Sequence, residues 1–71
     1  MPRYSSEEEV LYFTESELLN NSENVSLYVT YTPDGYSYLK TVNGRYVIGY
    51  DLENNTFTYG VFENAVKGVD N

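Results

Sequence analysis

The sequence predicts an α+β domain in which a four-stranded antiparallel meander carries one N-terminal helix on one of its faces. Two observations support the sheet: four segments rich in β-branched and aromatic residues follow one another from residue 25 onward, and turn-forming residues separate them. One observation supports the helix, because serines followed by glutamates precede the first apolar segment. With 71 residues, the chain is expected to form a single domain spanning 1–71.

The four expected strands cover residues 25–31, 36–42, 45–51 and 56–62. The first connection reads Thr-Pro-Asp-Gly, in which the proline sets the first corner and Gly35 accepts a positive φ. The second contains Asn43 and Gly44, a dipeptide typical of two-residue hairpins. The third contains two asparagines, which tolerate the left-handed region. Each connection is therefore short enough to join antiparallel neighbours.

These turns predict a register with one aliphatic face. A three-residue Pro-Asp-Gly loop pairs Val29 with Leu39, and a two-residue Asn-Gly turn then pairs Leu39 with Ile48. A two-residue turn between the last two strands pairs Ile48 with Val61. Because three turns assigned separately give one consistent row, we expect these four side chains to form the centre of the core.

The opposite face of the expected sheet is mixed. Its central positions carry both aromatic and aliphatic side chains, which are too apolar to remain in water without a partner. We expect this face to meet a second copy of the chain or another protein. Its members are Tyr28, Tyr38, Val47 and Phe62.

The N-terminal segment allows two interpretations. A helix over residues 6–20, capped by Ser5 or Ser6, is favoured because a sheet with one apolar face needs a cover. The rival interpretation places a strand at 10–13 and begins a helix at a second capping box, Thr14 to Glu17. Either way, residues 64–71 are predicted to form a flexible tail. The sheet face that the N-terminal segment covers stays open at this point.

Charge is the strongest functional signal in the sequence. Eleven acidic residues against four basic ones give a net charge of −7, and the segment from Tyr4 to Leu39 holds seven acids and no base. Such a surface attracts basic proteins and repels nucleic acid and anionic membranes. The predicted partner is therefore a basic protein, with no nucleic acid and no membrane. The predicted acidic stripe consists of Glu7, Glu8, Glu9, Glu15, Glu17, Glu23 and Asp34.

Most catalytic chemistry is excluded by composition. The chain has no cysteine and no histidine, so it lacks thiolate and imidazole ligands and the usual base for activating a serine or threonine. We therefore expect no catalytic residues, no metal site and no cofactor, and we expect that the protein is not an enzyme. The polar, acidic N-terminus is unlike a signal peptide, so the expected location is the cytoplasm.

In size, acidity and tyrosine content, the chain resembles the small acidic phage-encoded proteins that mimic DNA and disable host machinery, among them the inhibitor of the histone-like nucleoid protein HU. The resemblance covers the whole chain and concerns composition, since no motif carries it. It implies a DNA-mimic inhibitor that blocks the DNA-binding surface of a basic host protein, with HU-like proteins as the first candidates. It also allows a homodimer.

A second function class fits the same sequence. The protein could be an adaptor or inhibitor that binds another protein through its tyrosine-rich sheet face, with acidity serving only solubility. A small subunit of a larger complex is a third interpretation. Salt separates the first two, because binding by charge weakens as ionic strength rises and binding by aromatic burial does not.

Overall fold

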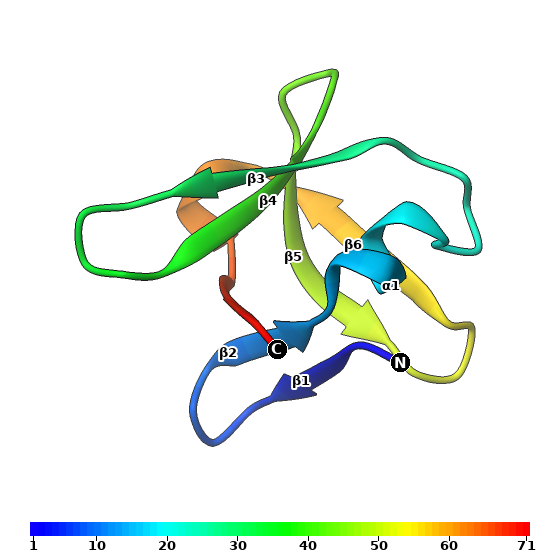
Figure 1. Cartoon of the computed structure of the whole chain (residues 1–71), viewed down its shortest axis with the longest axis horizontal. Coiled ribbons are helices and arrows are strands. Elements are labelled where there is room, and N and C mark those ends of the chain that lie inside the picture. The colour runs from blue at the N-terminus through cyan, green and yellow to red at the C-terminus, as the bar shows by residue number, and fades with distance from the viewer.

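The computed structural model describes all 71 residues as a mostly β protein, in which one seven-stranded mixed sheet curls into a half-barrel beside a short helix (Figure 1). The predicted four-stranded antiparallel meander with a helix over 6–20 is therefore wrong. The helical elements are α1 (Glu15–Leu19) and the single 3-10 turn η1 (Phe62–Asn64). The strands are β1 (Arg3–Ser5), β2 (Val10–Phe13), β3 (Leu27–Tyr31), β4 (Ser37–Thr41), β5 (Tyr46–Asp51), β6 (Thr56–Gly60) and β7 (Lys67–Asp70).

The last strand, β7, lies in the middle of the sheet. The order is β1-β2-β7-β4-β5-β6, with β3 paired to β4 alone. β7 runs parallel to β2 and antiparallel to β4, so that Gly68 lies opposite Leu11 on one side and Ser37 on the other. Figure 1 shows the red C-terminal end beside β2. The flexible tail predicted for 64–71 is thus wrong for the residues of β7, which connect the N-terminal hairpin to the remaining strands.

The N-terminal segment turns back on itself where a helix was expected. The Ser5 hydroxyl accepts a hydrogen bond from the Glu8 N–H at 3.2 Å, as the predicted cap would, but this bond closes a turn and no helix follows it. The backbone leaves the helical path at Glu9, which has a φ of 59°, and the chain returns as β2. The physical reason is the residue content of β2: Val-Leu-Tyr-Phe is β-branched and aromatic and gains more from pairing with β1 and β7 than from a helical turn.

Helix α1 begins at the second capping box, as the rival interpretation held. The Thr14 hydroxyl accepts from the Glu17 N–H, and the Glu17 carboxylate accepts from the Thr14 N–H at 2.7 Å. One side chain of this short helix, Leu18, is buried in the core. No helix of the protein has the length and apolar character that crossing a bilayer requires.

The β3–β4 register is confirmed and the β4–β5 register is wrong by one residue. Val29 lies opposite Leu39, as the Pro-Asp-Gly loop predicts. Between β4 and β5, however, only Gly44 has a positive φ, and the loop holds three residues rather than two. Thr41 and Arg45 close it: the Thr41 N–H donates to the Arg45 carbonyl at 2.8 Å, and the Thr41 hydroxyl accepts from the Arg45 N–H at 3.2 Å. A shift of one residue exchanges the two faces of a strand.

The last hairpin departs from its prediction as well. Asp51 lies opposite Thr56, so the connection has four residues, and the Asp51 carboxylate accepts hydrogen bonds from two backbone N–H groups within it. Further along, Ile48 is an extra residue between two paired positions, Val47 and Gly49. Such a bulge bends the strand and increases its twist. It therefore contributes to the curl of the sheet.

The core lies inside the curl and differs from the predicted aliphatic row. Leu39 is buried as expected, and Val29 packs against the core. Ile48 is only partly buried and Val61 is 59% exposed, whereas Val47, assigned to the outer face, is 1% exposed. The core cluster comprises Leu11, Phe13, Leu18, Leu39, Val47 and Phe57.

Two valine-to-alanine substitutions test this register. Val47→Ala removes a buried isopropyl group and should lower the free energy of unfolding by about 2 kcal/mol, whereas Val61→Ala should change it by less than about 0.5 kcal/mol. Urea denaturation followed by circular dichroism measures both. The reverse order of the two losses would support the register predicted from the two-residue turns and contradict the fold described here.

Candidate functional site

A surface cleft of about 350 Å³ brings acidic and tyrosine side chains together from segments far apart in the chain. One wall is the β1–β2 hairpin with its turn, and the facing wall is η1 with the segment leading into β7. The residues just before and within β4 line it as well. Its polar and aromatic lining comprises Tyr4, Glu8, Glu9, Tyr36, Tyr38, Glu63, Asn64 and Lys67.

The hairpin turn fixes the acidic side of the cleft. The Glu9 N–H donates to the Ser5 carbonyl at 2.7 Å, and the Glu8 carboxylate accepts from the Tyr12 hydroxyl at 2.8 Å. This hydrogen bond to Glu8, with partial burial and the charge of Glu8, raises the pKa of Tyr12. The protonated phenol donates this hydrogen bond at neutral pH and so orients the Glu8 carboxylate. Glu63, on η1, supplies the third acid of the cleft.

An aromatic cluster borders the cleft on the η1 side. Tyr38 and Phe62 meet edge to face with ring centroids 5.4 Å apart, and Tyr46 meets Phe62 in the same way at 5.0 Å. Phe62 itself is 55% exposed. Exposed rings beside carboxylates form a surface suited to a cation, because the ring face attracts positive charge and a guanidinium can stack on it.

All four basic side chains are engaged with the protein's own surface. Lys67 lies 3.7 Å from the Asp34 carboxylate and over the Tyr36 ring at 4.5 Å. Arg45 donates to the Tyr59 carbonyl. Arg3 lies over the Tyr12 ring at 4.4 Å, and Lys40 lies over the Tyr46 ring at 5.9 Å.

The carboxylates, by contrast, are mostly without a cationic partner. Of the eleven acidic side chains, only Glu17 and Asp34 form ion pairs, which leaves nine without one. The protein therefore presents negative charge that its own bases do not neutralise.

The predicted acidic stripe does not lie on one element, because the helix that would have carried it is absent. Glu7, Glu8 and Glu9 occupy the β1–β2 turn, while the remaining four positions are spread over α1, the α1–β3 connection and the β3–β4 turn. Only Glu8 and Glu9 reach the cleft. Glu63 was missed because it lies next to the segment regarded as a tail.

Besides Glu8, which binds the Tyr12 hydroxyl, three predicted stripe residues have structural partners. Asp34 accepts from the Thr32 hydroxyl and the Tyr36 N–H, and these bonds, with the charge of Lys67, hold its pKa below the usual value. Glu23 accepts from the Tyr59 hydroxyl at 3.4 Å. Burial, followed by the charge and hydrogen bond of Glu23, raises the pKa of Tyr59 to about 12.

The third is Glu17. Burial acts to raise its pKa, but hydrogen bonds from the Met1 ammonium group and from Thr14 outweigh burial, so the net pKa lies below its usual value. Glu17 thus belongs to the helix cap and the N-terminus rather than to an open binding surface.

The predicted partner face divides between the core and the surface. Val47 is buried, so it is unable to contact a partner. Tyr38 lines the cleft, and Phe62 packs against Tyr38 without lining it. Tyr28 lies on β3 and is 52% exposed. The rows assigned to this face separate because β5 is shifted by one residue against β4.

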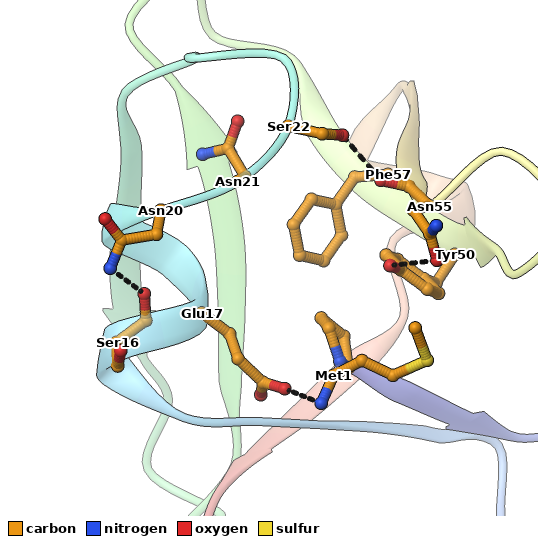
Figure 2. A pocket seen from close by; sticks show the side chains of 10 residues that line it. Met1, Ser16, Glu17, Asn20, Asn21, Ser22, Tyr50, Asn55 and Phe57 are labelled. Atoms are coloured by element: carbon orange, nitrogen blue, oxygen red, sulfur yellow. Dashed lines mark hydrogen bonds and ion pairs between the residues drawn. The ribbon is translucent and has the colours of Figure 1, made fainter.

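A second hollow, of about 320 Å³, lies between α1 and the β5–β6 turn (Figure 2). The Met1 ammonium group and the Glu17 carboxylate meet across it at 2.5 Å, and the Ser22 hydroxyl donates to the Asn55 carbonyl at 2.6 Å. The other polar groups shown are mainly amides and hydroxyls. The hollow offers hydrogen bonds to a small polar molecule, but no hydroxyl in it has an imidazole to activate it.

No three acidic side chains are grouped closely enough to hold a metal ion. No protein-family model matches the chain, and no curated protein or solved structure matches it either. The function must therefore be argued from the charge and the geometry of the cleft.

The pKa of Glu17 gives a prediction for acid stability. Because its folded pKa lies below the usual value near 4.5, the ionised group stabilises the fold at neutral pH, and this contribution disappears as pH falls through the folded pKa. Glu17→Gln should lower the free energy of unfolding at pH 7 by about 1 kcal/mol and should reduce the dependence on pH below about 4.5.

Glu15→Gln is the matched control, since Glu15 lies in the same helical turn and has no ion-pair partner. Thermal melts from pH 3 to 7 measure both variants. Equal losses for the two variants at pH 7 would show that the cap and ion pair at Glu17 contribute nothing specific.

Proposed function

We propose that this protein is a non-enzymatic inhibitor that binds a basic DNA-binding host protein in the place of DNA, with HU-like nucleoid proteins as the first candidates. One observation carries the proposal: nine of the eleven carboxylates have no cationic partner, while every base is engaged with the protein's own surface. A surface of this kind attracts the lysines and arginines that otherwise bind phosphates.

The acidic cleft is the proposed contact. Glu8, Glu9 and Glu63 supply charge, and Tyr38 supplies a ring in the lining. Phe62, exposed and packed against Tyr38, supplies a second ring next to the cleft on which a guanidinium can stack. A partner arginine entering here would exchange a DNA phosphate for a carboxylate. Electrostatic complementarity of this type raises the association rate as well as selecting the partner.

Order in the hairpin turn favours this role. Two hydrogen bonds close the turn. The Glu9 N–H donates to the Ser5 carbonyl, and the Glu8 N–H donates to the Ser5 hydroxyl. Carboxylates presented on a fixed turn lose less conformational entropy on binding than carboxylates on a free acidic tail. The turn is therefore better suited to competing with DNA than an unstructured acidic segment of equal charge.

The second candidate function is an adaptor that binds through aromatic side chains. Tyr28 and Phe62 are more than half exposed, and Tyr31 is 75% exposed. A homodimer formed through such side chains would double the acidic surface, but it must overcome repulsion between two chains of charge −7. Salt distinguishes the two candidate functions, because binding by aromatic burial keeps its affinity as ionic strength rises and binding by charge pairing loses it.

Competition with DNA tests the proposal. Labelled duplex DNA bound to HU is titrated with this protein at low salt and again at near-physiological salt, and bound DNA is followed by fluorescence anisotropy. The protein should displace DNA at low salt, and displacement should weaken as salt rises. No displacement at low salt would contradict the HU proposal, and displacement indifferent to salt would favour the aromatic adaptor.

A charge-matched pair of double variants tests the cleft. Glu9→Gln with Glu63→Gln removes two charges inside the cleft, and Glu23→Gln with Glu53→Gln removes two charges outside it. The first pair should weaken displacement about tenfold, since each lost ion pair contributes about 0.5–1 kcal/mol. Equal weakening by both pairs would mean that net charge alone governs binding, and the cleft would be the wrong site.

A further inference from the structure

Strand β3 has a free edge whose hydrogen-bonding groups lie beside a groove. β3 pairs with β4 and with no other strand. The Thr32 N–H donates to the Tyr36 carbonyl, and because bonded pairs alternate in an antiparallel ladder, Tyr31 and Val29 direct their N–H and carbonyl groups away from β4. By the same alternation, Leu27 does so too. No other hydrogen bond in the protein uses these backbone groups.

The side chains of the same three residues line an apolar groove of about 280 Å³ between β3 and α1. Leu18 and Leu19 form the opposing wall. A second hollow, of about 290 Å³, shares Leu18, Leu19 and Leu27 with it and extends the groove along the start of β3. Figure 1 shows β3 overlapping β4 in the view, with the long connection from α1 leading into it. Backbone donors, backbone acceptors and apolar space therefore occur along one edge.

The charge of the groove defines its occupant. Glu15 and Asp70 line it, neither forms an ion pair, and no basic residue lines it. A second copy of this chain would bring a charge of −7 against −7 and carries acids at the same edge. A basic segment has the opposite charge and suits the site.

We infer that β3 takes up an extended segment of the partner as an additional strand, with alternate apolar side chains in the groove and lysine or arginine residues beside Glu15 and Asp70. Main-chain hydrogen bonds supply affinity in such strand addition, and the groove and its two acids supply selectivity. This inference presupposes that the partner is basic, as the proposed function holds, and it adds to the cleft a second contact at the β3 edge, together with the conformation that the partner takes there.

A synthetic peptide tests the edge without DNA or HU, so its result is separate from the outcome of the competition experiment. The probe is a fluorescein-labelled peptide of alternating valine and threonine with two lysines at each end. Its control carries glutamates in place of the lysines. The lysine peptide should bind at low salt at least tenfold more tightly than the glutamate peptide, and the amides of Leu27, Val29 and Tyr31 should become protected from hydrogen exchange.

Two variants at one exposed position separate strand addition from contact by the side chain. Tyr31→Pro removes an N–H that faces the free edge, a position where proline is tolerated, and Tyr31→Thr keeps it. Proline should weaken binding at least tenfold and threonine by less than threefold. The double variant Glu15→Gln, Asp70→Asn should weaken binding several-fold and reduce its salt dependence, which keeps the test decisive if the proline variant is unstable.

Several results would overturn the inference. They are no binding of the lysine peptide at millimolar concentration, equal binding of the lysine and glutamate peptides, and binding that leaves the β3 amides unprotected. Protection of these amides that grows with protein concentration in the absence of peptide would assign the edge to a second copy of the chain, and would overturn it as well.

Discussion

The structure depends on one close approach, the passage of Gly68 between β2 and β4. A Cβ atom at this position would lie 2.6 Å from Cε1 of Phe13 and 3.1 Å from the Ser37 hydroxyl, so only glycine fits. The Ser37 hydroxyl donates to the Gly68 carbonyl at 3.1 Å. This close contact lets β7 fit between β2 and β4. β7 is the strand that connects the β1–β2 hairpin to the other strands of the sheet.

The proposed binding cleft follows from this arrangement. Its walls come from the first ten residues and from residues near the C-terminus, and β7 is the strand that brings them together. The same strand carries Lys67, whose charge is taken up by Asp34 and the Tyr36 ring. A lysine that lines an acidic cleft therefore has partners of its own, and Glu8, Glu9 and Glu63 are left for a cation from outside. Fold and charge thus point to one surface.

Local signals predicted part of this fold, and long-range contacts decided the rest. The Pro-Asp-Gly loop set the β3–β4 register correctly, because its geometry is local. The Asn-Gly turn failed because the Thr41 hydroxyl favours a longer loop. The Ser5 hydroxyl accepts from the Glu8 N–H, as it would at the start of a helix. A single turn forms the same hydrogen bond, so the Ser-Glu pattern alone does not distinguish the two. The β2–β7 pairing joins strands more than fifty positions apart and leaves no signal in either segment alone.

The sequence predicted the chemical character of the site but not the residues that form it. Composition indicated an acidic protein with aromatic surface, but the residues that meet in the cleft depend on β7, which reads as a polar tail because Lys67, Gly68 and Asp70 favour no strand. Glu63 was overlooked for that reason. The one available signal was the apolar pair Ala65 and Val66 just before β7, which a solvated tail would not need.

The most direct test of this account is amide hydrogen exchange at the two ends of β7, measured by NMR. The Val66 N–H donates to the Val47 carbonyl at 3.2 Å, and the Asn71 N–H donates to the Phe13 carbonyl at 2.8 Å. If β7 is the central strand, both amides should exchange much more slowly than the amide of the exposed Asn43 in the β4–β5 loop, and the amides within β7 should exchange as slowly as those of β4. Exchange at the rate of an unstructured peptide from residue 66 onward would contradict the account, because the sheet would lack its connecting strand and the cleft one of its walls.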